Sequence, residues 1–142
     1  MIKIIIIILS SLFVNHTFGD EIKINERMMN FKYSKKAMEQ IKESIIKDRF
    51  LHINDNALFL YNWFLVLPSY FPKGSESSIS NNSDASSEIW ENFDLFLKYS
   101  NNSKNITLSI LRSLEKKDKK IVKLKFDELE RSCRSCHKKF RN

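Results

Sequence analysis

The C-terminal segment of this 142-residue chain carries apolar or thiol side chains at a spacing that an α-helix places on one face. Successive members lie four, three, four, three and four residues apart: Val122, Phe126, Leu129, Cys133, Cys136 and Phe140. This alternation is typical of the inner seam of a helix that packs in a bundle. The chain contains only two glycines and two prolines, which favours helices over strands joined by tight turns.

Three earlier segments also show helical periodicity. We expect four helices with these approximate bounds: 21–48, 56–70, a third from 86 or 87 to about 117, and a last one that begins after 118. The second is apolar nearly all round, so we expect it to be buried on more than one side. Four helices with short connections predict an all-α, antiparallel up-down-up-down four-helix bundle.

Local signals refine the helix ends. Asn54 or Asp55 is the predicted N-cap of the second helix, and Asp118 is the predicted N-cap of the last. The polar run 101–103 interrupts the third helical pattern; we favour one continuous helix with a solvated waist, and a true break is the alternative. Residues 75–87 are rich in serine and asparagine and are predicted to form a mobile loop.

The N-terminus is interpreted as a secretory signal peptide, residues 1–19. A single charge, Lys3, precedes a run of about eleven mostly apolar residues, which is too short to span a bilayer. Small residues at the positions that a signal peptidase reads predict cleavage after Gly19, which leaves residues 20–142 as one domain. An uncleaved membrane anchor is the alternative.

The mature chain is moderately basic. Only Lys3 leaves with the signal peptide, so 23 basic residues face 17 acidic ones. The chain lacks the dense arginine runs of a nucleic-acid binder, and we expect no nucleic acid among its partners. Lysines and arginines gather over residues 116–139, where they form either a solvated face or a docking patch for an acidic redox partner.

The last helix ends in the sequence C-x-x-C-H, formed by Cys133, Cys136 and His137, which is the attachment sequence of a c-type haem. Two thiols at this spacing can each add to one vinyl group of a porphyrin, and the adjacent imidazole then ligates the iron. A redox-active dithiol, a zinc site and a plain disulfide are the alternatives. The first usually follows a strand, and the second needs more ligands than the sequence offers. The expected cofactor is one covalently bound haem c.

Four landmarks, in order, resemble the cytochrome c′ family, the class II c-type cytochromes. They are Arg27, Phe71-Pro72, Ile89-Trp90 and the terminal Cys133-x-x-Cys136-His137-x-x-Phe140-Arg141. The C-terminal position of the haem motif is the most specific of these. The resemblance covers essentially the whole mature chain and implies a periplasmic four-helix bundle, usually a homodimer through its first two helices.

The resemblance also implies roles around the haem. It suggests a five-coordinate iron with His137 below it, the apolar Phe31 above it and Arg141 beside the proximal face. Members bind nitric oxide and carbon monoxide and discriminate against dioxygen. The chemistry of Phe31 agrees, because a phenyl ring neither ligates iron nor donates the hydrogen bond that bound dioxygen requires. Trp90 and Phe140 are expected to pack at the haem edge or in the core.

Several assignments leave alternatives open. Met28 or Met29 is a candidate sixth ligand, as in low-spin electron-transfer members of the family, against ordinary core packing. His52 is a weaker candidate for the same role. Arg27 either holds a haem propionate or is a solvated charge.

The expected function is therefore that of a periplasmic haem protein that scavenges or senses nitric oxide, with electron transfer as the alternative. No acid–base pair or nucleophile stands out beyond the haem motif, so we do not predict an enzyme.

Overall fold

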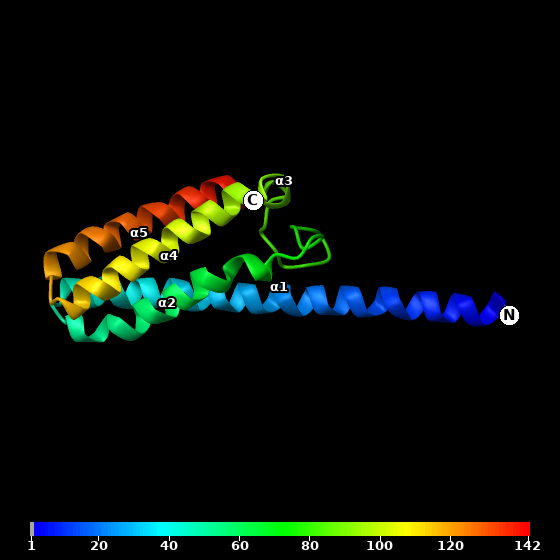
Figure 1. Ribbon diagram of the computed structural model, residues 1–142, viewed down its shortest axis with the longest axis horizontal. Coiled ribbons are helices and arrows are strands. Elements are labelled where there is room, and N and C mark those ends of the chain that lie inside the picture. Colours follow the sequence, from blue (N-terminus) through cyan, green and yellow to red (C-terminus); the bar gives the residue numbers. More distant parts are fainter. Residues whose placement is uncertain (1) are drawn as a thin grey trace.

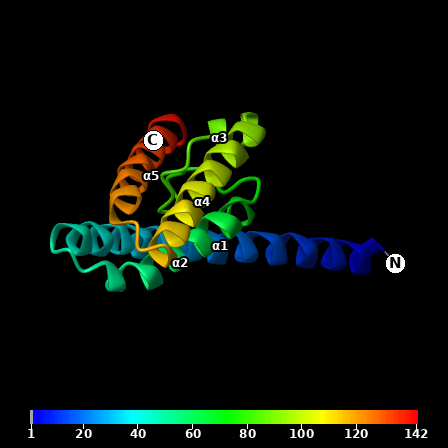
Figure 2. The same cartoon turned by 60° about the vertical axis from the view of Figure 1, so that its left-hand side comes forward.

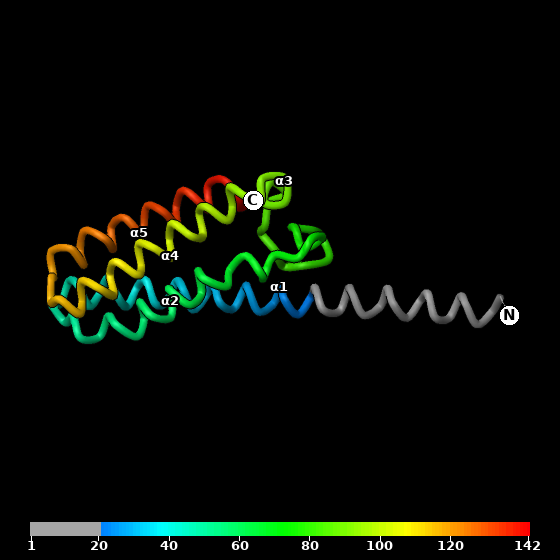
Figure 3. The backbone as a smooth tube through the Cα atoms, in the orientation of Figure 1, coloured from blue at the N-terminus to red at the C-terminus, as the bar shows by residue number. Residues whose placement is uncertain are grey.

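The computed structural model describes residues 21–142, which Figure 3 draws in colour. The predicted signal peptide, residues 1–19, and its cleavage site after Gly19 lie outside the described residues. Across the described part of the chain, none of the helices combines the length and the apolar character needed to cross a membrane.

Four long helices build the domain (Figure 1). They are α1 (Ile2–Ile46), α2 (Asn54–Val66), α4 (Phe93–Glu115) and α5 (Lys119–Phe140). The shorter elements are 3₁₀ turns at Phe50–His52 and Leu67–Tyr70 and the one-turn helix α3 (Glu88–Glu91). The predicted all-α four-helix bundle is confirmed.

The long helices are arranged so that the turns after α1 and α4 meet at one end of the bundle. There Lys119 Nζ donates to Asp48 Oδ2 at 2.7 Å. α2 packs against α1 and α4, and α4 packs along α5, as Figures 1 and 2 show. From this end the α4–α5 pair diverges from α1 toward the C-terminus of α5 (Figure 1). The end of α5 that carries the C-x-x-C-H sequence is thus its end farther from α1.

The inner seam of α5 lies where its spacing predicts. Its apolar members are buried: Val122, Phe126, Leu129 and Phe140. The two cysteines of the same seam are half-buried and pack against this core. This prediction is confirmed because the spacing of residues along one helix determines which of them share a face, whatever the partner helices are.

The helix ends agree with the sequence only in part. Asp118 caps α5 as predicted, because its Oδ1 accepts from Ile121 N at 3.0 Å. The predicted N-cap of α2 is wrong, since α2 follows Ile53 and no side chain caps it. Pro68 lies in the 3₁₀ turn that ends the predicted second helix, consistent with its missing amide N–H. α3 and α4 are separated at Asn92, a break that the sequence pattern did not predict.

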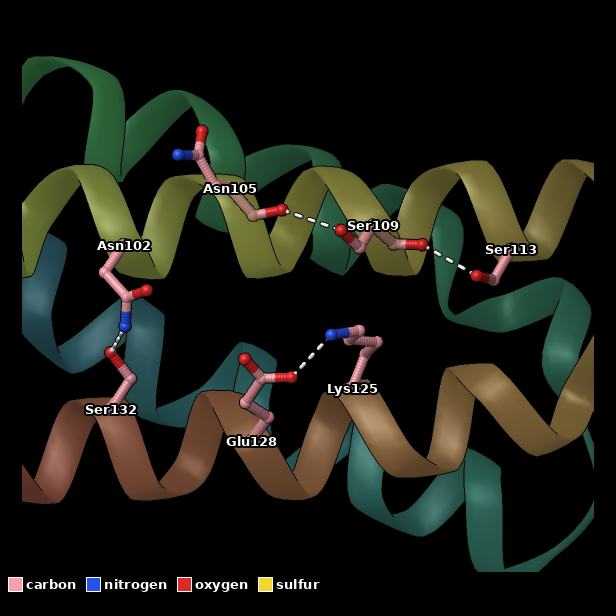
Figure 4. Close-up of polar contacts among 7 residues, drawn as sticks. All are labelled: Asn102, Asn105, Ser109, Ser113, Lys125, Glu128 and Ser132. Carbon is pink, nitrogen blue, oxygen red and sulfur yellow. Dashed lines mark hydrogen bonds and ion pairs between the residues drawn. The ribbon is translucent and has the colours of Figure 1, made fainter.

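The polar run in α4 lies inside one continuous helix, as predicted, and it is solvated at Asn101 and Asn102 but not at Ser103. Ser103 is buried, and its Oγ lies 2.9 Å from Ser132 Oγ. Asn102 Nδ2 donates to the same Ser132 oxygen at 3.1 Å (Figure 4). These bonds tie α4 to α5 one residue before Cys133 and so fix the axial position of the C-x-x-C-H sequence.

The serine-rich segment predicted as a mobile loop is held at defined points instead. Ser75 and Ser83 are buried, and Ser83 Oγ donates to Ser75 O at 3.1 Å. Ser77 N donates to Ala85 O at 2.8 Å, which closes the segment into a compact loop. Composition alone misses this, because serine side chains can equally face water or satisfy a buried partner.

Candidate haem site

The two thiols of the C-x-x-C-H sequence are free and half-buried on α5. Burial raises the pKa of Cys133 to about 11. Burial, and to a smaller extent electrostatic repulsion from Cys133, raises the pKa of Cys136 to about 12. Both sulfurs are therefore protonated at neutral pH, unlike the low-pKa thiolates of redox dithiols. Neutral thiols in an apolar setting suit conversion to uncharged thioethers.

The described part of the chain places no further metal-ligating side chains around these two cysteines. Among residues 21–142, no three His, Cys, Asp or Glu side chains are grouped so that they could hold a metal ion. A structural zinc site needs four such ligands. The arrangement does not support the zinc alternative.

The His137 ring faces α1 from the end of α5. Its centroid lies 6.3 Å from that of Phe31, with 72° between the ring planes. His137 is exposed at the helix surface, yet its pKa is lowered, first by desolvation from neighbouring side chains and then by the charge of Arg141. A lowered pKa favours the neutral imidazole, which is the form that ligates a metal. The structure thus brings the predicted axial ligand and the predicted distal residue next to one another, in an edge-to-face arrangement.

Phe31 is surrounded by aromatic rings on its other sides. Its centroid lies 5.4 Å from Trp63 at 90° and 6.5 Å from Phe71. Trp63 is buried, and no residue accepts a hydrogen bond from its Nε1 within the described residues. A buried N–H without a partner is costly, and it points to an acceptor that the protein chain does not supply. A haem, with its two carboxylates, carries such acceptors.

Arg27 lies one turn before Phe31 on α1 and is only 2% exposed. Nη1 donates to Tyr70 O at 3.3 Å and to Ser75 Oγ at 2.7 Å, and Nη2 donates to Ser75 O and Ser83 Oγ. Its guanidinium also lies over the Phe71 ring, 4.5 Å from the centroid. The alternative of a solvated charge is wrong.

The charge of Arg27 has no carboxylate partner among residues 21–142. Burial lowers its pKa from 12.5 to about 10, so the guanidinium stays charged at neutral pH. A buried cation without a counter-charge is unusual, because burial of an unpaired charge is expensive. An anionic group close to Arg27 would remove this cost.

Phe140 is part of the core beside this cluster, and the half-buried Trp90 packs against it. Trp90 Nε1 donates to Phe71 O at 3.2 Å, and the rings of these two residues lie 6.3 Å apart. Phe140 is buried against α4, 5.5 Å from Phe96 and 5.7 Å from Tyr99. Trp90 supports the ring that packs on Phe31, whereas Phe140 holds the end of α5 on α4.

The three candidate sixth ligands differ in position. Met28 is half-buried, three residues before Phe31, whereas Met29 is 51% exposed. His52 is exposed in the turn after α1, at the end of the bundle where α5 begins. His137 lies 18 residues along α5, or roughly 27 Å at 1.5 Å per residue. His52 is therefore not brought to the site.

Sequence reasoning missed Trp63 and the 75–83 serines as members of this region. Trp63 was one apolar residue among many in an apolar helix, although an indole N–H in such a helix signals the need for an acceptor. Ser75 and Ser83 carried no signal, since their role depends on Arg27, which lies 48 and 56 residues away.

The residues brought together define a class of protein. Two neutral thiols, a nearby imidazole and an aromatic pocket that holds an unpaired N–H and a buried positive charge fit a covalently attached haem held inside a four-helix bundle.

Comparison with known proteins gives the family. Residues 23–141 match the family described as Cytochrome C′. The cytochrome c′ of Rhodospirillum rubrum is 29% identical over 87 residues, and the match spans 61% of this chain and 58% of that protein. The chain belongs to the cytochrome c′ family, whose cofactor is haem c.

Solved structures show the same fold at low identity. A cytochrome c′ with ligand-controlled dimer dissociation has a TM-score of 0.78 and 16% identity, covering 86% of this chain and 95% of its own. A nitric oxide complex of a cytochrome c′ variant from Alcaligenes xylosoxidans has a TM-score of 0.75 and 17% identity, covering 87% and 95%.

Proposed function

We propose that this protein binds nitric oxide and carbon monoxide at a five-coordinate haem c attached through Cys133 and Cys136, with His137 as the axial ligand. When bound, the haem supplies an iron with one open coordination position. The observation that carries the proposal is Phe31, whose ring lies 6.3 Å from that of His137. A phenyl ring on that side neither occupies the open position nor donates a hydrogen bond, which favours nitric oxide and carbon monoxide over dioxygen.

The surrounding residues keep this site dry and hold the cofactor. Trp63 and Phe71 back Phe31 with apolar surface, which excludes water. The Trp63 N–H supplies a free donor for a haem carboxylate, and the Arg27 guanidinium, whose Nη groups already donate to protein oxygens, supplies positive charge. No residue here has the role of a nucleophile or general base, so we propose ligand binding rather than catalysis.

A second candidate function rests on Met28. This half-buried thioether lies three residues before Phe31 on α1, so it is on a neighbouring part of the same helix face and is a candidate sixth ligand. The site would then be closed to gases and the protein would transfer electrons to a redox partner.

The proposed setting is the periplasm, after cleavage of the signal peptide, and the proposed assembly is a homodimer. Large apolar side chains remain exposed on the first two helices: Ile22, Met29, Tyr33, Leu58, Leu65 and Val66. An apolar surface of this kind on neighbouring helices is suited to pack on a second copy. A related structure is described with a dimer that dissociates under ligand control, which supports this proposal. Sedimentation of the haem-loaded protein tests it.

The decisive experiment is a spectrum of the purified ferrous protein with and without nitric oxide. Co-expression with a haem-attachment system should add the mass of one haem, and Cys133→Ala with Cys136→Ala should abolish this covalent mass. We expect a high-spin ferrous spectrum that changes on addition of nitric oxide. A sharp low-spin spectrum that ignores nitric oxide, and that opens in Met28→Ala, would instead establish the electron carrier.

A further inference from the structure

The loop between α2 and α3 connects the helix that carries Phe31 with the end of α5. On one side, Ser75 and Ser83 receive hydrogen bonds from Arg27 of α1. On the other side, the next residue, Asp84, pairs with Arg141 directly after α5. One short segment therefore contacts both elements that flank the proposed haem site.

The contact between Asp84 and Arg141 is specified by both side chains and backbone. Arg141 Nη2 and Nε donate to the same Asp84 oxygen at 2.6 and 3.1 Å. Asn142 N donates to Asp84 O at 2.9 Å, and Ser86 N donates to Phe140 O at 3.0 Å. An isolated bridge pairs Ala85 with Arg141. These backbone bonds hold the two segments side by side, so that pairing of the two side chains costs less entropy than in an ordinary surface ion pair.

Arg141 also lies close to the proposed iron ligand. Its backbone N–H donates to His137 O at 3.0 Å, one helical turn back. Its guanidinium, which Asp84 holds, is thus a positive charge on a residue one helical turn after His137. A nearby positive charge disfavours the more positive ferric form of an iron that His137 ligates. The carboxylate of Asp84 opposes this effect and also fixes where the guanidinium lies.

We propose that Asp84 is a positioning residue, which holds the Arg141 guanidinium beside His137 and offsets its charge, and thereby sets the reduction potential of the haem. This inference rests on the proposed function, because it concerns the iron that His137 ligates. Asp84 touches neither haem nor ligand in this scheme; it acts through Arg141.

The structure offers a charge-matched control. Glu88 of α3 pairs with Lys139 on the last turn of α5, so Glu88→Gln and Asp84→Asn each remove one carboxylate from an ion pair near His137. Only Asp84→Asn releases Arg141. Both replaced side chains are nearly isosteric, and the haem-loaded protein is used throughout.

The experiment measures the midpoint reduction potential of the haem in a double-mutant cycle of Asp84→Asn and Arg141→Gln, with Glu88→Gln alongside. We expect Asp84→Asn to shift the potential differently from Glu88→Gln, because it also releases Arg141, and we expect this additional part of the shift to disappear when Arg141→Gln is present. Equal shifts in the Asp84 and Glu88 variants, or a full Asp84→Asn shift in the Arg141→Gln background, would overturn the inference.

The outcomes also separate this inference from the proposed function. A wild-type protein without covalent haem, or one whose spectrum ignores nitric oxide, contradicts the proposed function. A wild-type protein that takes up haem and binds nitric oxide, with no coupling between Asp84 and Arg141, contradicts the role of Asp84 alone.

Discussion

The two ends of the bundle are built in different ways. The haem end consists of the C-terminal half of α5, the middle of α1 and the 71–87 loop; the tip consists of residues 46–53 and 115–120, where the turns meet. At the haem end Arg27 and Ser75 are buried and hydrogen-bonded to one another. At the tip Ile46 is 74% exposed and Leu51 is 96% exposed.

The two ends also differ in where their charged side chains lie and in what these side chains pair with. The tip is held by exposed ion pairs, Lys47 with Glu43 and Lys119 with Asp48, and by local turn geometry with positive φ at Asp48 and Lys117. The haem end buries a guanidinium with neutral partners. Exposed pairs contribute little to stability, whereas buried polar groups are expensive to disturb. Stability should therefore depend strongly on residues at the haem end and weakly on those at the tip.

The largest effect is expected from Phe71→Ala at the haem end. Phe71 packs against Phe31, Phe96 and Trp90, with centroids 4.7 to 6.5 Å away. Removal of such a ring typically costs about 3–5 kcal/mol of unfolding free energy. The control at the tip is Leu51→Ala. In urea unfolding it should change the free energy of unfolding by no more than about 0.5 kcal/mol. Similar losses in both variants would show that the two ends do not differ in this way.

A second substitution tests the buried charge itself. Arg27→Met keeps much of the side-chain volume but removes every donor to Tyr70, Ser75 and Ser83. Loss of charged hydrogen bonds that leaves buried acceptors unpaired should cost about 3 kcal/mol, read from urea unfolding of the haem-loaded protein. Arg49→Met at the exposed tip is the matched control and should be nearly neutral. An Arg27 variant as stable as the Arg49 variant would contradict the importance of this contact.

The sequence was informative where a structure depends on neighbours along the chain. The spacing of Val122, Phe126 and Leu129 defines the α5 seam without reference to other helices, and Asp118 caps α5 through a bond to a residue three positions away. The C-x-x-C-H sequence is likewise local. The helix α5 and its thiol–imidazole set could therefore be predicted.

Features that join distant segments could not be predicted in this way. Arg27 and Ser83 are 56 residues apart, and Asp84 and Arg141 are 57 apart. No periodicity or capping rule connects such pairs, so the loop was expected to be mobile. The break at Asn92 separates α3 from α4. The helical spacing of apolar residues does not reveal it.

A local contribution at the tip is expected from Asp118, whose carboxylate accepts from Ile121 N. Asp118→Ala should lower the unfolding free energy by about 1 kcal/mol, which is typical of a lost N-cap. Asn54→Ala provides the control at the start of α2, where no side chain caps the helix, and it should have almost no effect on the urea midpoint. A comparable loss in Asn54→Ala would mean that Asn54 caps α2 after all.

The smallest effect is expected from the exposed pair of Asp48 and Lys119. The hydrogen bond from Lys119 is the main cause of the lowered pKa of Asp48. Because the carboxyl group binds its proton less readily in the folded state, its contribution is present above the unfolded pKa near 3.8 and is lost as pH falls through the lower folded pKa. Asp48→Asn should thus be slightly less stable than wild type at neutral pH and equal to it well below pH 3.8, with the difference reduced by salt. A difference that persists unchanged in strong acid would show that Asp48 acts through its positive-φ backbone and not through its charge.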